Sequence, residues 1–374
     1  MSRRITPSRV VHAVGRRLGL ARNEVKLRRQ LLHNYAPRSV LVTGETAVRA
    51  ARFPAVDVHN HLGRWLNQGR AWMAPDVGAL VAAMDELNVA TTVNLDGRWD
   101  AELDANLDRY DRAHPGRFLT FCHLDWSLLT DRRFPERFPA MLRRAKDAGA
   151  GGIKVWKDLG LDVRDHDGTL VQPDDPRLHD TWEAAADLDL PVLMHTADPV
   201  AFWLPVDRTN ERFEELTLHP DWHHGSRAVP GHDELVTAFE RVVAAHPRTT
   251  FVGAHVASCA EDLDRASAML DRYPNLVVDL AAREAELGRQ PRAAAAFLTR
   301  HPDRVLWGTD SFPFRPEQLR TWYRLLETTD EHFPYGTEPP QQGRWSVYGM
   351  GLDDAALRSV YADNARRIIP GLRV

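Results

Sequence analysis

The sequence has few of the features that mark secreted, membrane-spanning or nucleic-acid-binding proteins. Its 374 residues include only two cysteines, Cys122 and Cys259, which cannot form a disulfide framework and favour a reducing, cytoplasmic location. No apolar run approaches the roughly 20 residues of a membrane span. No apolar core follows Arg3 and Arg4, so we expect neither a membrane partner nor a secretory signal. A net charge of -4 argues against a general nucleic-acid binder.

The composition is that of a globular protein with a distinct N-terminal segment. Apolar residues make up 43% and charged residues 27% of the chain, as in ordinary globular domains. Before residue 50 there are eleven Lys or Arg and only two Glu, with an irregular helical pattern. We therefore expect a basic helical extension over 1–50, packed on its own domain or on a second subunit of a homodimer, followed by one domain over 51–374.

Strand-like and helix-like segments alternate from residue 55 onwards. This alternation is typical of βα units and a parallel sheet, and eight units over about 255 residues match a (β/α)8 TIM barrel. The predicted strands are 55–62, 90–96, 118–125, 151–156, 191–197, 249–257, 276–282 and 305–311. The predicted helices are 75–88, 100–113, 135–148, 176–189, 233–246, 260–273, 289–300, 315–329 and 353–369.

Polar residues recur at or near the ends of these strands. His59 and His61 alternate with apolar neighbours, so their side chains project from the same face of the first strand. The active-site residues of such barrels lie at the C-terminal ends of the strands, and we therefore expect the polar strand-end groups to meet there. The others are Lys154 on strand four, His195 after strand five, His255 after strand six and Asp310 after strand eight.

The residue types at these positions indicate metal chemistry. Imidazole nitrogens with a carboxylate oxygen suit Zn²⁺, with Mn²⁺, Fe²⁺ and Co²⁺ as alternatives. Three histidines and one aspartate can leave one coordination position of the ion for water. Such an open position is typical of a catalytic metal site, whereas a structural site is closed. Zinc lowers the pKa of a bound water to about 7.

These residues resemble the amidohydrolase superfamily, and within it the amidohydrolase-related proteins that include aminocarboxymuconate semialdehyde decarboxylase. The resemblance rests on Asp57-Val58-His59-Asn60-His61, His195, His255 and Gly308-Thr309-Asp310, and it runs from about residue 55 to Asn364-Ala365. It implies that one metal ion is held by His59, His61, His195 and Asp310. It also implies that His255 is a general acid/base and that Asp310 has a second role in proton transfer.

Two strand residues have more than one interpretation. Lys154 could bridge two metals as a carbamylated lysine, with His255 on the second ion, or it could hold a substrate carboxylate. We favour one metal. Asp57 could contribute to the metal or only orient a neighbouring side chain.

Long loops after the strands are expected to build the substrate pocket. We assign substrate binding to Lys154, Trp156, Arg208 and Arg283, because tryptophans and arginines around a barrel mouth suit a small, planar, anionic or aromatic substrate. A loop of about 34 residues follows His195, and loops of that length are commonly functional. We interpret three histidines in it as lid surface: His219, His223 and His224.

The same ligand set serves two reactions. We expect hydrolysis of an amide, ester or lactone by a metal-activated water, because hydrolytic chemistry dominates the superfamily that the chain resembles. The alternative is non-oxidative decarboxylation of an aromatic or muconate-type acid, by a carboxy-lyase. A further alternative is a barrel that binds a metal or ligand without turnover.

Overall fold

The computed structural model describes residues 20, 22–335 and 342–372. The chain divides into two units, 1–43 and 44–374, and the predicted extension, 1–50, ends a few residues beyond this division. In the first unit, residues 22–28 are helical and a short 3-10 helix, η1, covers Leu32–Asn34. Part of the predicted helical pattern of the extension lies in residues 1–19 and 21, outside the described residues.

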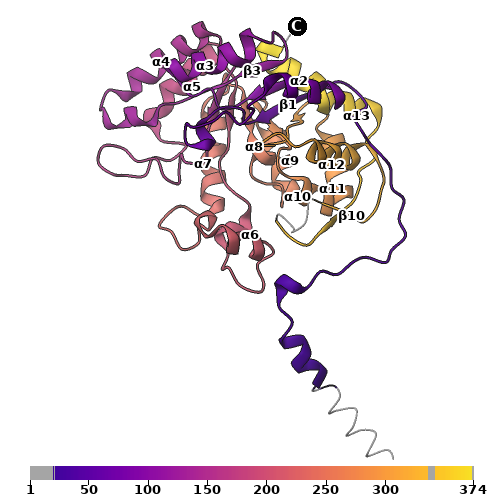
Figure 1. Cartoon of the computed structure of the whole chain (residues 1–374). Helices are drawn as coiled ribbons and strands as arrows, with labels where there is room; N and C mark the ends of the chain where they lie inside the picture. Colours follow the sequence, from indigo (N-terminus) through magenta and orange to yellow (C-terminus); the bar gives the residue numbers. More distant parts are fainter. Residues whose placement is uncertain (1–19, 21, 336–341, 373–374) are drawn as a thin grey trace, which may run out of the picture. The chain divides into compact units, whose positions relative to one another are not determined.

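The second unit alternates parallel strands with helices (Figure 1). Each neighbouring pair of strands within the two main sheets is parallel. The strands are β1 (Ala55–Asn60), β2 (Val89–Asn94), β3 (Phe118–Thr120), β4 (Cys122–His123), β5 (Ile153–Val155), β6 (Val192–Met194), β7 (Phe251–Gly253), β8 (Leu276–Asp279) and β9 (Val305–Leu306).

Backbone hydrogen bonds join these strands into a closed cylinder. β3 and β4 are one strand interrupted at Phe121, whose backbone N–H donates to the carbonyl of Asn94 at 2.9 Å. At the other edge, the N–H of Val58 donates to the carbonyl of Trp307 at 3.1 Å. The segment at the end of the last strand therefore pairs with the first strand, and this pairing closes the cylinder.

Helices follow the strands where the sequence predicts them. Asp76 and Asp262 accept hydrogen bonds from backbone N–H groups at the starts of α2 and α9, as N-cap residues do. The helices are α2 (Val77–Glu86), α3 (Asp100–Leu107), α4 (Phe134–Ala148), α5 (His179–Asp187), α6 (Phe213–Leu218), α7 (His232–Ala245), α8 (Ala254–Ala257), α9 (Leu263–Arg272), α10 (Glu284–Arg289), α11 (Pro291–Arg300), α12 (Pro316–Glu327), α13 (Asp354–Arg358) and α14 (Asn364–Ile368). A small hairpin, β10 (Phe333–Pro334) and β11 (Ser346–Val347), was not predicted.

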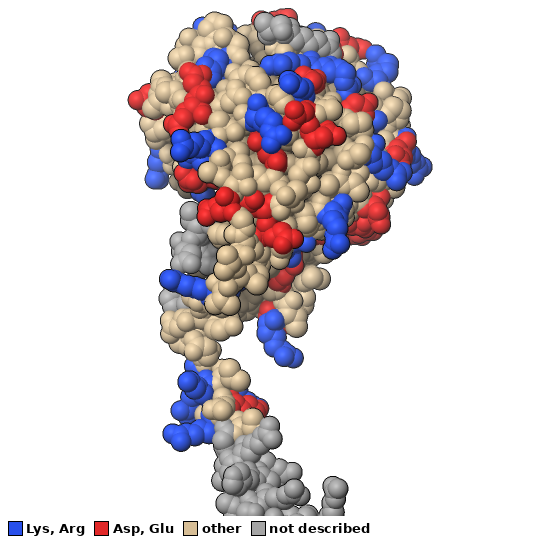
Figure 2. Space-filling model, turned by 90° about the vertical axis from the view of Figure 1, so that its right-hand side faces the viewer, with Lys and Arg blue, Asp and Glu red and all other residues tan. Residues whose placement is uncertain are grey.

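Charges of both signs are interspersed on the face drawn in Figure 2. Many charged side chains of the second unit pair, as Arg320 does with Glu86 at 2.8 Å and Arg248 with Asp187 at 2.8 Å. Within 20, 22–335 and 342–372, no helix is long and apolar enough to cross a membrane.

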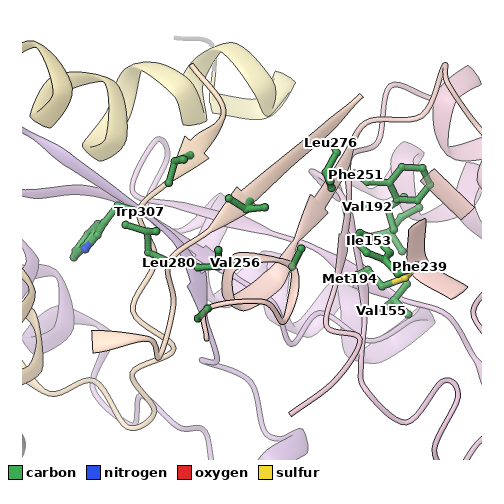
Figure 3. Close-up of a cluster of buried hydrophobic side chains, with 14 of the residues drawn as sticks. Ile153, Val155, Val192, Met194, Phe239, Phe251, Val256, Leu276, Leu280 and Trp307 are labelled. Carbon is green, nitrogen blue, oxygen red and sulfur yellow. The ribbon is translucent and has the colours of Figure 1, made fainter. Parts of the chain in front are cut away.

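The side-chain alternation of the strands separates two apolar clusters. Ile153 and Val155 belong to the cluster between strands and helices, together with Val192, Phe239 and Phe251 (Figure 3). A second cluster fills the cylinder with inward-facing residues of the strands and closes it with residues of the C-terminal helices: Val56, Val58, Val93, Leu193, Val252, Val277, Leu306, Ala365 and Ile369. Because successive strand side chains point to opposite faces, Lys154 between Ile153 and Val155 points into the cylinder.

Candidate active site

The strands carry the predicted polar residues to one end of the cylinder. His59 is on β1, His61 follows that strand, and Lys154 is on β5. The residues that follow β6, β7 and β9 are His195, His255 and Asp310. These six side chains are at least four-fifths buried.

The rings of His59 and His61 approach the carboxylate of Asp310. Its Oδ1 atom lies 3.4 Å from Nε2 of His61 and 3.8 Å from Nε2 of His59. This approach is possible because Gly308 has no side chain, and a Cβ atom there would lie only 2.8 Å from Cβ of His59. The N–H of Asp310 also donates to the carbonyl of His59 at 2.8 Å. The φ of Asp310 is +55°, a left-handed conformation that aspartate tolerates better than most residues.

Two buried aspartates contact the Nδ1 atoms of the His59 and His61 rings. Nδ1 of His61 lies 2.7 Å from Oδ1 of Asp96, and Nδ1 of His59 lies 2.9 Å from Oδ2 of Asp279. A carboxylate can only accept, so each Nδ1 carries a hydrogen, and in a neutral ring so held Nε2 keeps its lone pair. The sequence pattern did not predict either aspartate as a site residue. Asp96 ends the predicted strand 90–96, and Asp279 ends the observed strand β8. Acidic partners of this kind are what metal-binding histidines require.

His195 lies in the same cluster, beside the ring of His255. Their ring centroids are 4.3 Å apart, and the ring of Trp156 is 5.8 Å from that of His195. The donor atoms of His59, His61 and Asp310 all lie within 4.8 Å of one another, and His195 is outside that tightest group. Burial lowers the pKa of His195 well below its usual range, so its ring is neutral at neutral pH.

The unpaired buried atoms test whether these residues fit a metal ion. Nε2 of His61, Nε2 of His195 and Oδ1 of Asp310 are buried without a hydrogen-bond partner. A buried polar atom without a partner is costly, and here three such atoms are of the types that bind Zn²⁺ or Mn²⁺. Burial also keeps the pKa of His59 low, which leaves its ring neutral and able to bind a cation. The residues therefore fit a divalent metal ion.

His255 begins a turn of unusual backbone conformation. Its φ is 58° and its ψ is 46°, and the next three residues also have positive φ. For residues other than glycine this left-handed region costs roughly 1–2 kcal/mol each, and such strain is typical of functional sites. Nδ1 of His255 lies 2.7 Å from the carbonyl oxygen of Ala281, so Nδ1 donates and Nε2 is the free nitrogen.

Three of the predicted substrate residues surround these rings. Nζ of Lys154 lies 3.2 Å from Nε2 of His59 and 5.0 Å from the ring centroid of Trp156. Burial lowers the pKa of Lys154 to about 8. Trp156 also lies against His61, with ring centroids 5.0 Å apart. Arg283 is buried after β8, and its positive charge lowers the pKa of His255 further, after burial itself.

The prediction for Arg208 is not matched by its position. Arg208 is exposed on the long loop after β6 and does not belong to the buried cluster. The buried guanidinium of that loop is that of Arg212, which pairs with Glu215 at 2.8 Å and with Glu286. An irregular loop has no hydrophobic periodicity that would show which of its side chains are buried. The sequence therefore could not distinguish the buried Arg212 from the exposed Arg208.

The same loop is anchored by a histidine that we expected at the surface. His224 is buried, and its Nε2 lies 2.8 Å from Oδ2 of Asp198. Lys157 donates to both oxygens of Asp198, at 2.6 and 2.8 Å. The interpretation of His224 as lid surface is therefore wrong, whereas His219 is exposed and His223 is only half-buried. The burial of His224 beside Asp198 depends on the tertiary structure, and no local sequence pattern indicates it.

Asp57 has a structural role. Its oxygens accept hydrogen bonds from the backbone N–H of His59 and from both the N–H and the hydroxyl of Thr309, at 3.2, 2.9 and 2.6 Å. Asn60 donates to it as well, at 3.0 Å. Burial raises the pKa of Asp57 to about 6. Both oxygens accept hydrogen bonds, so Asp57 fastens the first strand to the segment that follows the last.

The chain is similar to known proteins in sequence and in fold. The amidohydrolase family model matches residues 56–371. No curated protein matches the sequence. A 2,6-dihydroxybenzoate decarboxylase from Rhizobium superposes with a TM-score of 0.52 and 17% identity over 84% of this chain and 98% of that one.

Two other solved structures have the same architecture. A 5-carboxyvanillate decarboxylase from Novosphingobium aromaticivorans, complexed with manganese, gives a TM-score of 0.53 at 12% identity over 87% of this chain and 99% of that one. A TIM-barrel protein from Bordetella bronchiseptica gives 0.50 at 14% identity, over 86% and 99%. At these identities the likeness shows the fold, and it confirms the predicted (β/α)8 barrel. With the family model spanning most of its length, the chain belongs to the amidohydrolase family.

Proposed function

We propose that this protein is a metal-dependent, non-oxidative decarboxylase of a small aromatic acid. The observation that carries the proposal is the pair of buried cations, Lys154 and Arg283, beside a set of metal-binding side chains and the ring of Trp156. Solved structures with this fold and TM-scores above 0.5 include decarboxylases of dihydroxybenzoate and carboxyvanillate. Together these features favour the carboxy-lyase over the hydrolase that we expected first.

The side chains around the site suit an anionic aromatic molecule. Trp156 offers a ring face next to Lys154, and Phe312 also lies against His61, with ring centroids 5.4 Å apart. Aromatic side chains bind planar rings by offset or edge contacts. Lys154 and Arg283 supply the positive charge that a carboxylate needs when it leaves water.

His59, His61, His195 and Asp310 would hold the metal ion. Three imidazoles and one carboxylate suit Zn²⁺, with Mn²⁺, Fe²⁺ and Co²⁺ as alternatives. When bound, the ion supplies positive charge that withdraws electrons from an oxygen of the acid. We favour one metal ion, and a second ion on Lys154 and His255 is the alternative.

Decarboxylation needs a proton at the carbon that loses carbon dioxide. The electron pair of the broken carbon–carbon bond stays on the ring carbon, which then takes up one proton. Nδ1 of His255 is committed to the carbonyl of Ala281, so Nε2 is the atom that would take up a proton from solvent and deliver it to the ring carbon. Asp310 is the second acid/base group, because burial raises its pKa.

A product assay separates the two reactions. The protein is loaded with Zn²⁺ or Mn²⁺ and incubated with 2,6-dihydroxybenzoate, 5-carboxyvanillate and a panel of aryl lactones, esters and amides. We expect carbon dioxide and the decarboxylated phenol from at least one acid, and no such release by His61→Ala, which lacks a metal ligand. Turnover of the lactone, ester or amide panel without carbon dioxide from any aromatic acid would instead support the hydrolase.

A further inference from the structure

Asp279 uses both of its carboxylate oxygens inside the site. It is the last residue of β8 and is fully buried. Oδ2 lies 2.9 Å from Nδ1 of His59. Oδ1 accepts hydrogen bonds from the backbone N–H of His255 at 2.8 Å and of Ala281 at 3.1 Å. One side chain therefore connects a metal-binding ring of β1 with the backbone that follows β7.

These contacts distinguish Asp279 from a metal ligand. One potential metal-binding atom from each of His59, His255 and Asp279 lies within 4.8 Å of the other two, as such atoms would around an ion. However, Nδ1 of His59 already faces Oδ2, and Oδ1 already accepts two backbone hydrogen bonds. Hydrogen-bond donors surround the carboxylate, so the arrangement is a hydrogen-bonded connection between elements.

The backbone bonds also fix the orientation of the carboxylate. The N–H groups of His255 and Ala281 belong to the strained turn after β7 and to the start of the loop after β8. Ser258 anchors the other end of that turn, because its hydroxyl oxygen accepts from the N–H of Ala197 at 3.0 Å. Because the N–H groups of His255 and Ala281 both point at the Oδ1 position, only an oxygen can occupy it. The second terminal atom of the side chain at position 279 must then face His59.

We propose that Asp279 is a positioning residue that sets the tautomer of His59 and thereby its affinity for the metal ion. Because the carboxylate accepts, Nδ1 of His59 carries the hydrogen and Nε2 keeps the lone pair that faces Lys154 and Asp310. The consequence for metal binding rests on the proposed function, whereas the tautomer itself does not.

Asp279→Asn tests this assignment. The amide oxygen takes the Oδ1 position, so its NH₂ group faces Nδ1 of His59 and forces that nitrogen to accept. The hydrogen then moves to Nε2, which can no longer bind a cation. We expect Mn²⁺ binding to weaken by about 10–100-fold, as for other partners of metal-binding histidines, with an unchanged circular dichroism spectrum.

Asp111→Asn is the matched control. Asp111 accepts from the N–H of Thr120 at 2.8 Å and from its hydroxyl at 2.5 Å. A hydroxyl can also accept from an amide, so this substitution should leave Mn²⁺ affinity unchanged.

Long-range ¹H–¹⁵N spectra of metal-free, histidine-labelled protein read the tautomer directly. With the His59 signals assigned from His59→Gln, we expect the hydrogen on Nδ1 in the wild type and on Nε2 in Asp279→Asn. A wild-type hydrogen on Nε2 would overturn the proposal, and this readout decides even if the variant does not fold. Weakening of Mn²⁺ binding by less than tenfold in folded Asp279→Asn would overturn it as well. If the wild type binds no Mn²⁺ but has the Nδ1 tautomer, the proposed function fails and the positioning role stands.

Discussion

At the scale of single residues, the site depends on neutral imidazole rings with defined tautomers. Burial holds the pKa of His59, His195 and His255 well below the usual range. A neutral ring has one nitrogen that donates and one that accepts. The partners of His59 and His255 occupy Nδ1 in both cases, so the accepting nitrogens face the centre of the site.

His255→Asn separates proton transfer from metal binding. An asparagine amide can still donate to the carbonyl of Ala281, and asparagine tolerates the left-handed backbone of this position. We expect metal content to stay at the wild-type level while kcat falls by about 10²-fold or more, as for other lost acid/base groups. Elemental analysis and steady-state kinetics measure the two. Loss of a second metal ion in this variant would show that the site is dinuclear.

Glu284 makes the stability of the protein depend on pH. Burial raises its pKa to about 7, against a usual value of 4.5. The folded state therefore favours the protonated form. The stabilisation from this preference is complete below about pH 4.5 and is lost as pH rises through about 7.

Glu284→Gln should mimic the protonated form. Gln318 donates to Oε1 of Glu284 at 2.8 Å, and a glutamine oxygen can accept that bond. Relative to wild type, we expect the variant to gain roughly 1–3 kcal/mol of unfolding free energy between pH 4.5 and 7.5. Urea unfolding of both proteins across this range measures the difference, and a difference that does not change with pH contradicts the prediction.

The sequence predicted the side chains that gather at the centre of the site better than the residues that hold them in place. His59, His61, His195, His255 and Asp310 follow from one rule, that polar residues at barrel strand ends meet at one rim. Asp96 and Asp279 obey the same rule, but their partners are 35 and 220 positions away in sequence. Which carboxylate faces which ring depends on the closure of the cylinder, and local patterns do not contain this information.

At the scale of elements, a group of polar and charged side chains around Asp198 attaches the long loop after β6 to the barrel. Asp198 follows β6, Lys157 follows β5, and His224 comes from the distal part of the loop. Arg227 extends the group by a contact with Nδ1 of His224 at 3.2 Å. The loop therefore has a fixed attachment close to the rim that carries the site.

His224→Ala should loosen this loop selectively. The substitution removes a hydrogen bond to a buried carboxylate, which we expect to raise amide hydrogen exchange in 199–229 several-fold while leaving β1 and β9 protected. His223→Ala is the control. Its Nε2 bonds only the carbonyl of Leu204, at 2.9 Å, and lies outside the group around Asp198. Equal exchange in the two variants would mean that His224 does not anchor the loop.

The elements themselves were largely predictable because hydrophobic periodicity and capping residues are local. The predicted helices 75–88 and 135–148 correspond to α2 (Val77–Glu86) and α4 (Phe134–Ala148). The break between β3 and β4 was not predictable. It arises at Phe121, whose backbone bonds pass to β2 and to Gly97. The hairpin of β10 and β11 has strands of two residues each, too short for a periodic signal.

At the scale of the whole molecule, charge is unevenly divided along the chain. Residues 1–43 contain ten Lys or Arg and one Glu, which leaves 38 Lys or Arg against 51 Asp or Glu in residues 44–374. Apolar side chains in the described part of the first unit are also exposed, including Leu27, Val40 and Val42. A basic segment with exposed apolar residues suits a second copy of this chain, because residues 44–374 carry a net negative charge.

Removal of residues 1–43 tests this expectation of a homodimer. We expect the full chain to be a dimer that weakens in high salt, because surface charge attraction is screened. The truncated chain should be a monomer with an unchanged melting temperature. Light scattering after size-exclusion chromatography measures both masses. Equal numbers of copies in the two proteins would show that the segment does not hold a dimer together.

The most direct test of the account is a metal-anomalous diffraction map of crystals grown with Zn²⁺ or Mn²⁺. We expect one peak, within bonding distance of Nε2 of His59, His61 and His195 and of a carboxylate oxygen of Asp310. An absent peak, or a single peak bound by other side chains, would contradict it.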